Sequence, residues 1–109
     1  DMLWWGPSGI GASYTQARYL AQHCRPFEAG IEFVRHDGHE TRIGEGRFGG
    51  FFGYPSMYAR SMGGYLGAAT RAERPVEMRI VDLYRREGDL LAENWIFIDH
   101  LWFLHQLGH

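Results

Sequence analysis

The sequence has a single cysteine and no long apolar segment. Cys24 is the only thiol among 109 residues, so an internal disulfide is excluded and a reducing compartment is expected. No apolar run approaches the roughly 20 residues of a membrane helix, and no signal peptide is recognisable. We therefore expect a cytoplasmic protein that does not enter a membrane.

An excess of positive charge is also missing. The formal net charge is −2, so the chain has no basic surface suited to nucleic acid. The glycine-rich motifs that bind phosphates or dinucleotides are absent in their required context, and no cofactor is predicted. His36 and His39 are three residues apart, but Gly38 between them interrupts any helix, so no metal site is predicted.

What the chain does have is an apolar composition rich in aromatic residues. Hydrophobic residues make up 45% and aromatic residues 16% of the chain, which predicts one globular domain over residues 1–109. A helix is expected to begin at Ser13, an N-cap with Gln16 three positions later, and to end within about one turn of Pro26. The glycines of residues 46–53 predict bulges in a strongly bent sheet. Strands are expected over residues 2–5 and 57–66, and a hairpin over residues 76–98. For residues 30–36 the pattern allows either a strand or a loose continuation of the preceding segment.

The hairpin carries an acid on a face that should be dry. Alternation places Asp82 among core-type residues, where a lone carboxylate is costly. If Arg85 pairs with Leu90, Asp82 and Asp99 share a face with Trp95. This register is an assumption, because a slip of one residue would invert the faces.

Three segments of the chain resemble one family. Residues 79–108, R-I-V-D-L-Y-R-R-E-G-D-L-L-A-E-N-W-I-F-I-D-H-L-W-F-L-H-Q-L-G, resemble the closing segment of SnoaL-like polyketide cyclases, members of the nuclear-transport-factor-two-like superfamily. W-W-G-P-S-G-I-G at 4–11 and G-G-Y-L-G at 63–67 resemble two earlier motifs of that family, so the resemblance spans nearly the whole chain.

The resemblance implies an α+β fold. The expected architecture is a curved, mostly antiparallel sheet that forms a cone-shaped half-barrel around a pocket, with helices packed against it. The one or two helices that normally precede the first strand are not in this sequence. Their absence is expected to leave apolar sheet uncovered and to favour a homodimer.

The resemblance also implies catalytic residues. At the position of Asp99 the cyclases carry the general acid/base, and the same side chain is expected to cap the final helix. Asp82 is the second candidate catalytic residue; alternatively it is a buried acid paired with Arg79 or Arg60. Ser61 stands where the family often has a pocket histidine.

The predicted function is a cofactor-free acid/base enzyme of the cyclase or isomerase type. Its ligand would be a small apolar or aromatic molecule with a carbonyl group, polyketide-like or otherwise cyclic. The alternatives are a non-catalytic ligand-binding or protein-binding module on the same fold, and an epoxide or ester hydrolase built on Asp82, Arg60 and Asp99. The residues predicted to contact the ligand are Trp4, Arg60, Ser61, Tyr84 and Trp95.

Overall fold

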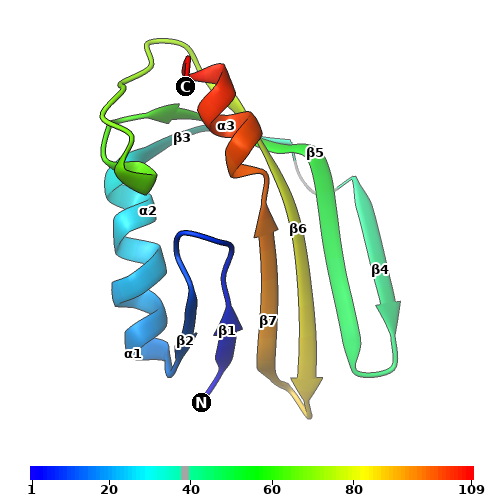
Figure 1. Ribbon diagram of the computed structural model, residues 1–109. Helices are drawn as coiled ribbons and strands as arrows, with labels where there is room; N and C mark the ends of the chain where they lie inside the picture. Colours follow the sequence, from blue (N-terminus) through cyan, green and yellow to red (C-terminus); the bar gives the residue numbers. More distant parts are fainter. Residues whose placement is uncertain (38–39) are drawn as a thin grey trace.

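A computed structural model describes residues 1–37 and 40–109. In this part of the chain, seven strands form one sheet in the order β2-β1-β7-β6-β5-β3, and β4 pairs with β5 (Figure 1). Every strand pair is antiparallel except β1 with β7. The predicted α+β fold with a curved, mostly antiparallel sheet is therefore confirmed. The strands are β1 (Leu3–Trp5), β2 (Ala12–Tyr14), β3 (Ile31–His36), β4 (Thr41–Glu45), β5 (Phe48–Ser61), β6 (Val76–Glu87) and β7 (Leu90–Ile98).

One helical rod runs beside the β1–β2 hairpin (Figure 1). It consists of α1 (Gln16–Tyr19), a π-helical segment (Leu20–Cys24) and α2 (Arg25–Gly30). The predicted N-cap Ser13 is wrong, because Ser13 pairs with Trp4 inside β2 and the Thr15 hydroxyl accepts the capping bond instead. The predicted end within about one turn of Pro26 is confirmed, since α2 ends at Gly30. Pro26 stands in the first turn of α2, where the π-helical segment precedes it and a missing N–H is tolerated.

The glycines of β5 let the sheet bend. A side chain at Gly50 would bring its Cβ within 2.6 Å of the Asp82 carbonyl oxygen, and the β5–β6 register shifts between Gly53 and Met57. The predicted bulge is confirmed there. The predicted strand over residues 57–66 is only partly right, because β5 starts at Phe48 and ends at Ser61, and Tyr65–Gly67 forms a 3₁₀ turn.

The predicted register of the β6–β7 hairpin is wrong. Asp82 pairs with Ile96 and Leu83 pairs with Trp95. The turn is tighter than expected, with Glu87 in place of Arg85 opposite Leu90, and an irregularity between Arg85 and Arg86 shifts the pairing by one further residue. The change from the expected register is three residues, an odd number, so Trp95 lies on the face opposite Asp82. We call the face that carries Asp82 the inner face and the face that carries Trp95 the outer face.

The core lies on the inner face. Its buried apolar residues come from β3, β5, β6, β7, the 3₁₀ turn and α3 (His100–Gln106). Phe103 of α3 is fully buried in it, which stabilises the fold by about 1.5–3 kcal/mol. Asp99 caps α3 as predicted, since its Oδ1 accepts from Trp102 N at 2.9 Å.

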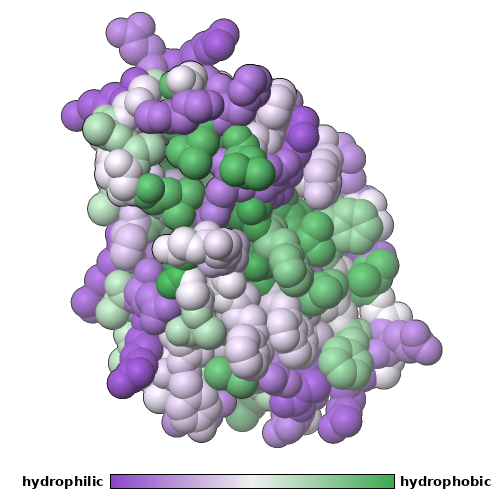
Figure 2. Space-filling model, in the orientation of Figure 1, coloured by the Kyte–Doolittle hydropathy of each residue, from purple (hydrophilic) through white to green (hydrophobic). Residues whose placement is uncertain are grey.

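The outer face is less well covered. No helix of the described residues lies in front of or behind the lower part of β4, β5 and β6 (Figure 1). Figure 2 shows apolar residues gathered in the middle of the molecule, bordered by polar residues at its edges. On the outer face Phe97 is 57% exposed, and Phe48 and Ile43 are exposed as well.

Candidate functional site

Asp82 is a buried acid on the inner face. Only 8% of its surface is exposed, and its carboxylate accepts hydrogen bonds from Asn94 Nδ2 and from the Tyr84 hydroxyl at 3.0 Å. Asn94 reaches Asp82 because it pairs with Tyr84 across the β6–β7 hairpin and so faces inward. Among the described residues no ion pair reaches Asp82. The predicted pairing with Arg79 or Arg60 does not occur, and two neutral donors hold the carboxylate instead.

This environment makes Asp82 suited to proton transfer. Burial raises the pKa of the Asp82 carboxyl above its usual value, while the hydrogen bonds from Asn94 and Tyr84 act in the opposite direction. Burial, followed by the charge and hydrogen bond of Asp82, raises the pKa of the Tyr84 phenol. Tyr84 therefore stays a neutral donor, and Asp82 is a carboxyl that takes up a proton more readily than an ordinary aspartate.

Aromatic side chains from the helical rod stand over this part of the inner face. Tyr19 meets Trp4 edge to face, with ring centroids 5.4 Å apart, and His23 stacks on Trp4 at 4.5 Å. The pKa of Tyr19 is raised by burial, by a hydrogen bond with Cys24 and by the negative charge of Asp82. Tyr19 thus packs against the aromatic side chains of this cluster and also interacts electrostatically with the acid.

Tyr19 also borders a hollow of about 590 Å³ at the end of the sheet where the β6–β7 turn lies. Its other walls come from the first residues of the chain, from α1 and from the hairpin, including Gln16 and Leu91. Tyr19 thus lines the hollow and interacts electrostatically with Asp82, whereas Asp82 itself is not part of the hollow's wall.

Sequence reasoning missed Tyr19, His23 and Asn94. Tyr19, His23 and Phe27 recur every four residues, a spacing that places them on one side of a helix. The signal for Asn94 depended on the hairpin register, which the sequence alone did not determine.

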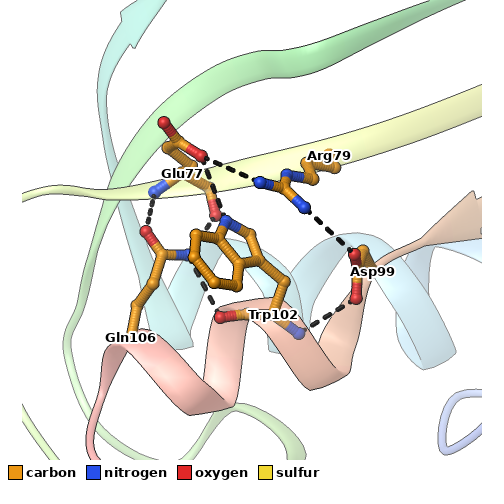
Figure 3. A network of polar contacts seen from close by, with 5 residues as sticks. All are labelled: Glu77, Arg79, Asp99, Trp102 and Gln106. Atoms are coloured by element: carbon orange, nitrogen blue, oxygen red, sulfur yellow. Dashed lines mark hydrogen bonds and ion pairs between the residues drawn. The ribbon is translucent and has the colours of Figure 1, made fainter.

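Asp99 lies in a separate network with Arg79 (Figure 3). Its carboxylate caps α3 and is 3.8 Å from Arg79 Nη1, and Arg79 Nη2 is 3.6 Å from Glu77. The Arg79 guanidinium lies over the Trp102 ring at 4.3 Å, and the Trp102 indole donates to Glu77 at 3.0 Å. Gln106 bonds the backbone N–H and C=O of Glu77. Arg79 alternates with the inward-facing residues of β6, so this network is not joined to Asp82.

Arg60 and Ser61 serve other contacts. Arg60 pairs with Glu32 at 3.0 Å and donates to the Glu73 carbonyl at 3.0 Å. Ser61 is buried and donates to the Thr70 carbonyl at 2.7 Å. The structure therefore does not assemble the hydrolase set of Asp82, Arg60 and Asp99.

Trp95 borders a second hollow, of about 470 Å³, on the outer face. Ile43, Phe48 and Leu83 line it as well, and Tyr84 forms part of its edge. Of the residues predicted to contact a ligand, Tyr84 bonds Asp82 and Trp4 shares its face, whereas Trp95 lies on the opposite face.

A histidine and a tyrosine pair near α3. The Tyr65 hydroxyl is 2.9 Å from His100 Nε2, and His100 Nδ1 is 3.3 Å from the Ser8 carbonyl. Burial lowers the pKa of His100, partly offset by Ser8 and Asp99.

The described residues contain no group of three or more histidine, cysteine or acidic side chains placed to hold a metal ion. His39, considered above together with His36, lies outside the described residues. None of the helices in the described ranges has the length and apolar character of a membrane span.

The whole chain is similar in structure to several solved proteins. IdmH from Streptomyces antibioticus, a proposed polyketide cyclase, superposes with a TM-score of 0.71 at 17% identity, covering 100% of this chain and 80% of IdmH. A proposed isomerase from Rhodopseudomonas palustris superposes with a TM-score of 0.69 at 15% identity, covering 100% of this chain and 77% of the isomerase. A proposed SnoaL-like polyketide cyclase from Shewanella putrefaciens CN-32 superposes with a TM-score of 0.62 at 14% identity, covering 99% of this chain and 68% of the cyclase.

No family model and no curated protein matches the sequence. The structural matches therefore establish the fold, and at that level they confirm the resemblance to SnoaL-like polyketide cyclases.

Proposed function

We propose that the chain is a cofactor-independent acid/base enzyme of the cyclase or isomerase type, with Asp82 as its proton-transfer group. The observation that carries this proposal is a buried carboxyl with a raised pKa and no cationic partner among the described residues. The substrate would be a small apolar or aromatic molecule with a carbonyl group. Structural neighbours named as proposed polyketide cyclases and a proposed isomerase support this class.

The first step would be proton abstraction next to the carbonyl. The Asp82 carboxylate takes the proton, the C–H electron pair forms a carbon–carbon double bond, and the carbonyl π pair moves onto oxygen. In an isomerase, Asp82 returns the proton at another carbon. In a cyclase, the enolate carbon attacks a second carbonyl and the resulting alkoxide takes the proton. Asn94 and Tyr84 hold the carboxylate in one orientation throughout.

The catalytic role expected for Asp99 remains a separate prediction. Its carboxylate is engaged by the cap of α3 and by Arg79. A test must therefore compare the two acids directly.

The two acids can be compared by NMR in deuterium oxide, which follows the exchange of the α-protons of 2-tetralone. The wild-type protein should accelerate exchange above buffer alone, and Asp82→Asn should lower the protein-dependent rate about 10²–10⁴-fold. Asp99→Asn keeps a good helix cap and should keep the exchange rate. If Asp82→Asn exchanges like the wild type, the proposal is wrong. If only Asp99→Asn loses exchange, Asp99 is the base.

A non-catalytic binding module is the second candidate. The apolar hollow beside Trp95 favours it, since it offers a binding surface on the face of the sheet opposite Asp82. A wild-type protein that binds 2-tetralone with no exchange above buffer would support this candidate over the enzyme.

The proposal includes a homodimer in the cytoplasm. The exposed apolar residues of the outer face, such as Phe97 and Phe48, support self-association, and the single cysteine is consistent with a reducing compartment. Light scattering at micromolar concentration should give twice the chain mass, and a monomer would refute the dimer.

A further inference from the structure

Three buried polar atoms on the inner face lack hydrogen-bond partners. They are Trp4 Nε1, Ser13 Oγ and His23 Nδ1, and none of these residues is more than 8% exposed. Elsewhere in residues 1–37 and 40–109, Arg79 Nε is the only other buried side-chain N or O atom without a hydrogen-bond partner. Three of four such atoms thus belong to one part of the fold.

The three residues are neighbours. Trp4 and Ser13 are directly opposite each other on β1 and β2, which places their side chains on the same face. His23 stacks on the Trp4 ring with centroids 4.5 Å apart. On its other side Trp4 pairs with Asn94, which bonds Asp82. Trp4 and Ser13 therefore lie on the same face of the sheet as the acid, with Asn94 between Trp4 and Asp82.

Two features of the backbone hold these residues in place. A Cβ at Gly6 would overlap the Trp4 ring, so glycine at this position lets the indole lie against the backbone. His23 comes from the π-helical segment Leu20–Cys24, and such segments are rare and frequent at functional sites.

The chemistry of the three groups fits a ligand oxygen. An unpartnered buried polar group costs about 1–3 kcal/mol, so three together call for an explanation. The indole N–H can only donate, and the serine hydroxyl can donate. Burial, and then the charge of His100, lower the pKa of His23, so its neutral ring can carry the hydrogen on Nδ1. Three donors suit an oxygen with free lone pairs.

We propose that Trp4, Ser13 and His23 bind the substrate carbonyl oxygen and stabilise the negative charge that it gains when Asp82 removes the neighbouring proton. This inference rests on the proposed function. The three donors keep their protons, and the charge that they stabilise comes from the carbonyl π pair. Donors fixed in a dry site are effective at this because they need no reorganisation during the reaction.

The indole resonance of Trp4 tests the proposal directly. In the ¹⁵N-labelled full chain, 2-tetralone should move the Trp4 Nε1–H signal downfield, whereas tetralin, which has the same rings without the oxygen, should not. Trp4→Phe identifies the signal and should weaken 2-tetralone binding about tenfold. Trp5→Phe is the matched control, since the Trp5 indole is on the outer face and contacts Glu93 at 3.5 Å. It should leave binding unchanged.

Ser13→Ala combines a measurement of stability without ligand with a measurement of 2-tetralone binding. Removing an unpartnered hydroxyl should leave the melting temperature unchanged or raise it, while weakening 2-tetralone binding several-fold. A fall in the melting temperature with unchanged binding would show that the hydroxyl serves a structural water, and it would overturn the proposal.

The two proposals fail in different ways. If Asp82→Asn abolishes exchange but 2-tetralone does not move the Trp4 signal, the acid is catalytic and the oxygen site is wrong. If the signal moves and Trp4→Phe weakens binding but Asp82→Asn exchanges normally, the oxygen site stands and the proposed function fails. The absence of 2-tetralone binding would overturn the oxygen site.

Discussion

The acids on the inner and outer sides of the sheet have different partners. Asp82 on the inner face has two neutral donors and no cation, whereas Asp99 is joined to Arg79 and to the N-terminus of α3. The same residue type is therefore costly in one place and stabilising in the other. Among acids in a folded chain, those without a compensating charge are the better candidates for chemistry.

The largest effect should come from crowding the inner face at Gly6. Gly6→Ala places a methyl group against the Trp4 ring and 2.5 Å from the Gly11 carbonyl oxygen, so we expect a loss of about 1–3 kcal/mol in the free energy of unfolding. Gly44→Ala is the control, because its Cβ would meet nothing closer than 3.9 Å. Urea unfolding of both variants measures the difference. Equal losses would mean that the Trp4 site is not tightly packed.

Removing the two acids should change stability in opposite directions. Because the Asp82 pKa is raised in the fold, its ionised form opposes folding as the pH rises, and Asp82→Asn should add about 0.5–2 kcal/mol at pH 7. Asp99→Ala loses a helix cap and should cost about 1 kcal/mol. Thermal unfolding of both variants shows whether each gains or loses stability. A destabilised Asp82→Asn would contradict a buried carboxyl that has no cationic partner.

The outer network should respond more weakly to loss of its cation. Arg79→Met keeps an apolar stem against Trp102 but removes the guanidinium from Glu77 and Asp99. Both ion pairs are partly exposed and longer than 3.5 Å, so we expect a loss of about 1 kcal/mol, most of it from the contact with Trp102. High salt should change the wild type and the variant to nearly the same extent. A strong salt dependence of the wild type alone would show that the ion pairs dominate.

The smallest effect should be a pH dependence from His23 and His100. Both have pKa values below the usual 6.5 in the fold, so the unfolded chain binds protons more readily. Their contribution to the free energy of unfolding is complete above about pH 6.5 and is lost as the pH falls below this value. Urea unfolding from pH 8 to pH 5, in the Asp82→Asn background, should show this fall. Stability that rises over the same interval would contradict the buried, neutral histidines.

The elements of this fold could be predicted better than their pairing. The hairpin of residues 76–98 and the cap at Asp99 follow from alternation and local hydrogen-bonding chemistry, and the structure confirms both. The hairpin register could not be predicted, because the irregularity between Arg85 and Arg86 leaves no clear mark in the residue pattern.

The candidate site was predictable only in part for the same reason. Asp82, Trp4 and Tyr84 were found from alternation and composition. Trp95 was misplaced and Asn94 was missed by the same error of register. The local sequence around Ser13 favours a helix cap, although the place of Ser13 in β2 is decided by its pairing with Trp4.

The parallel contact between β1 and β7 affects how the molecule folds. Leu3 pairs with Glu93, ninety positions later in the chain, so this contact closes almost the entire sequence into one loop. Closing such a loop is entropically costly and is expected late in folding, after the local β6–β7 hairpin. Trp4 reaches Asn94 only at that step. Opening of the ends should therefore dismantle the inner cluster while leaving the hairpin intact, and the amide protons of β1 should exchange with solvent faster than those of β6.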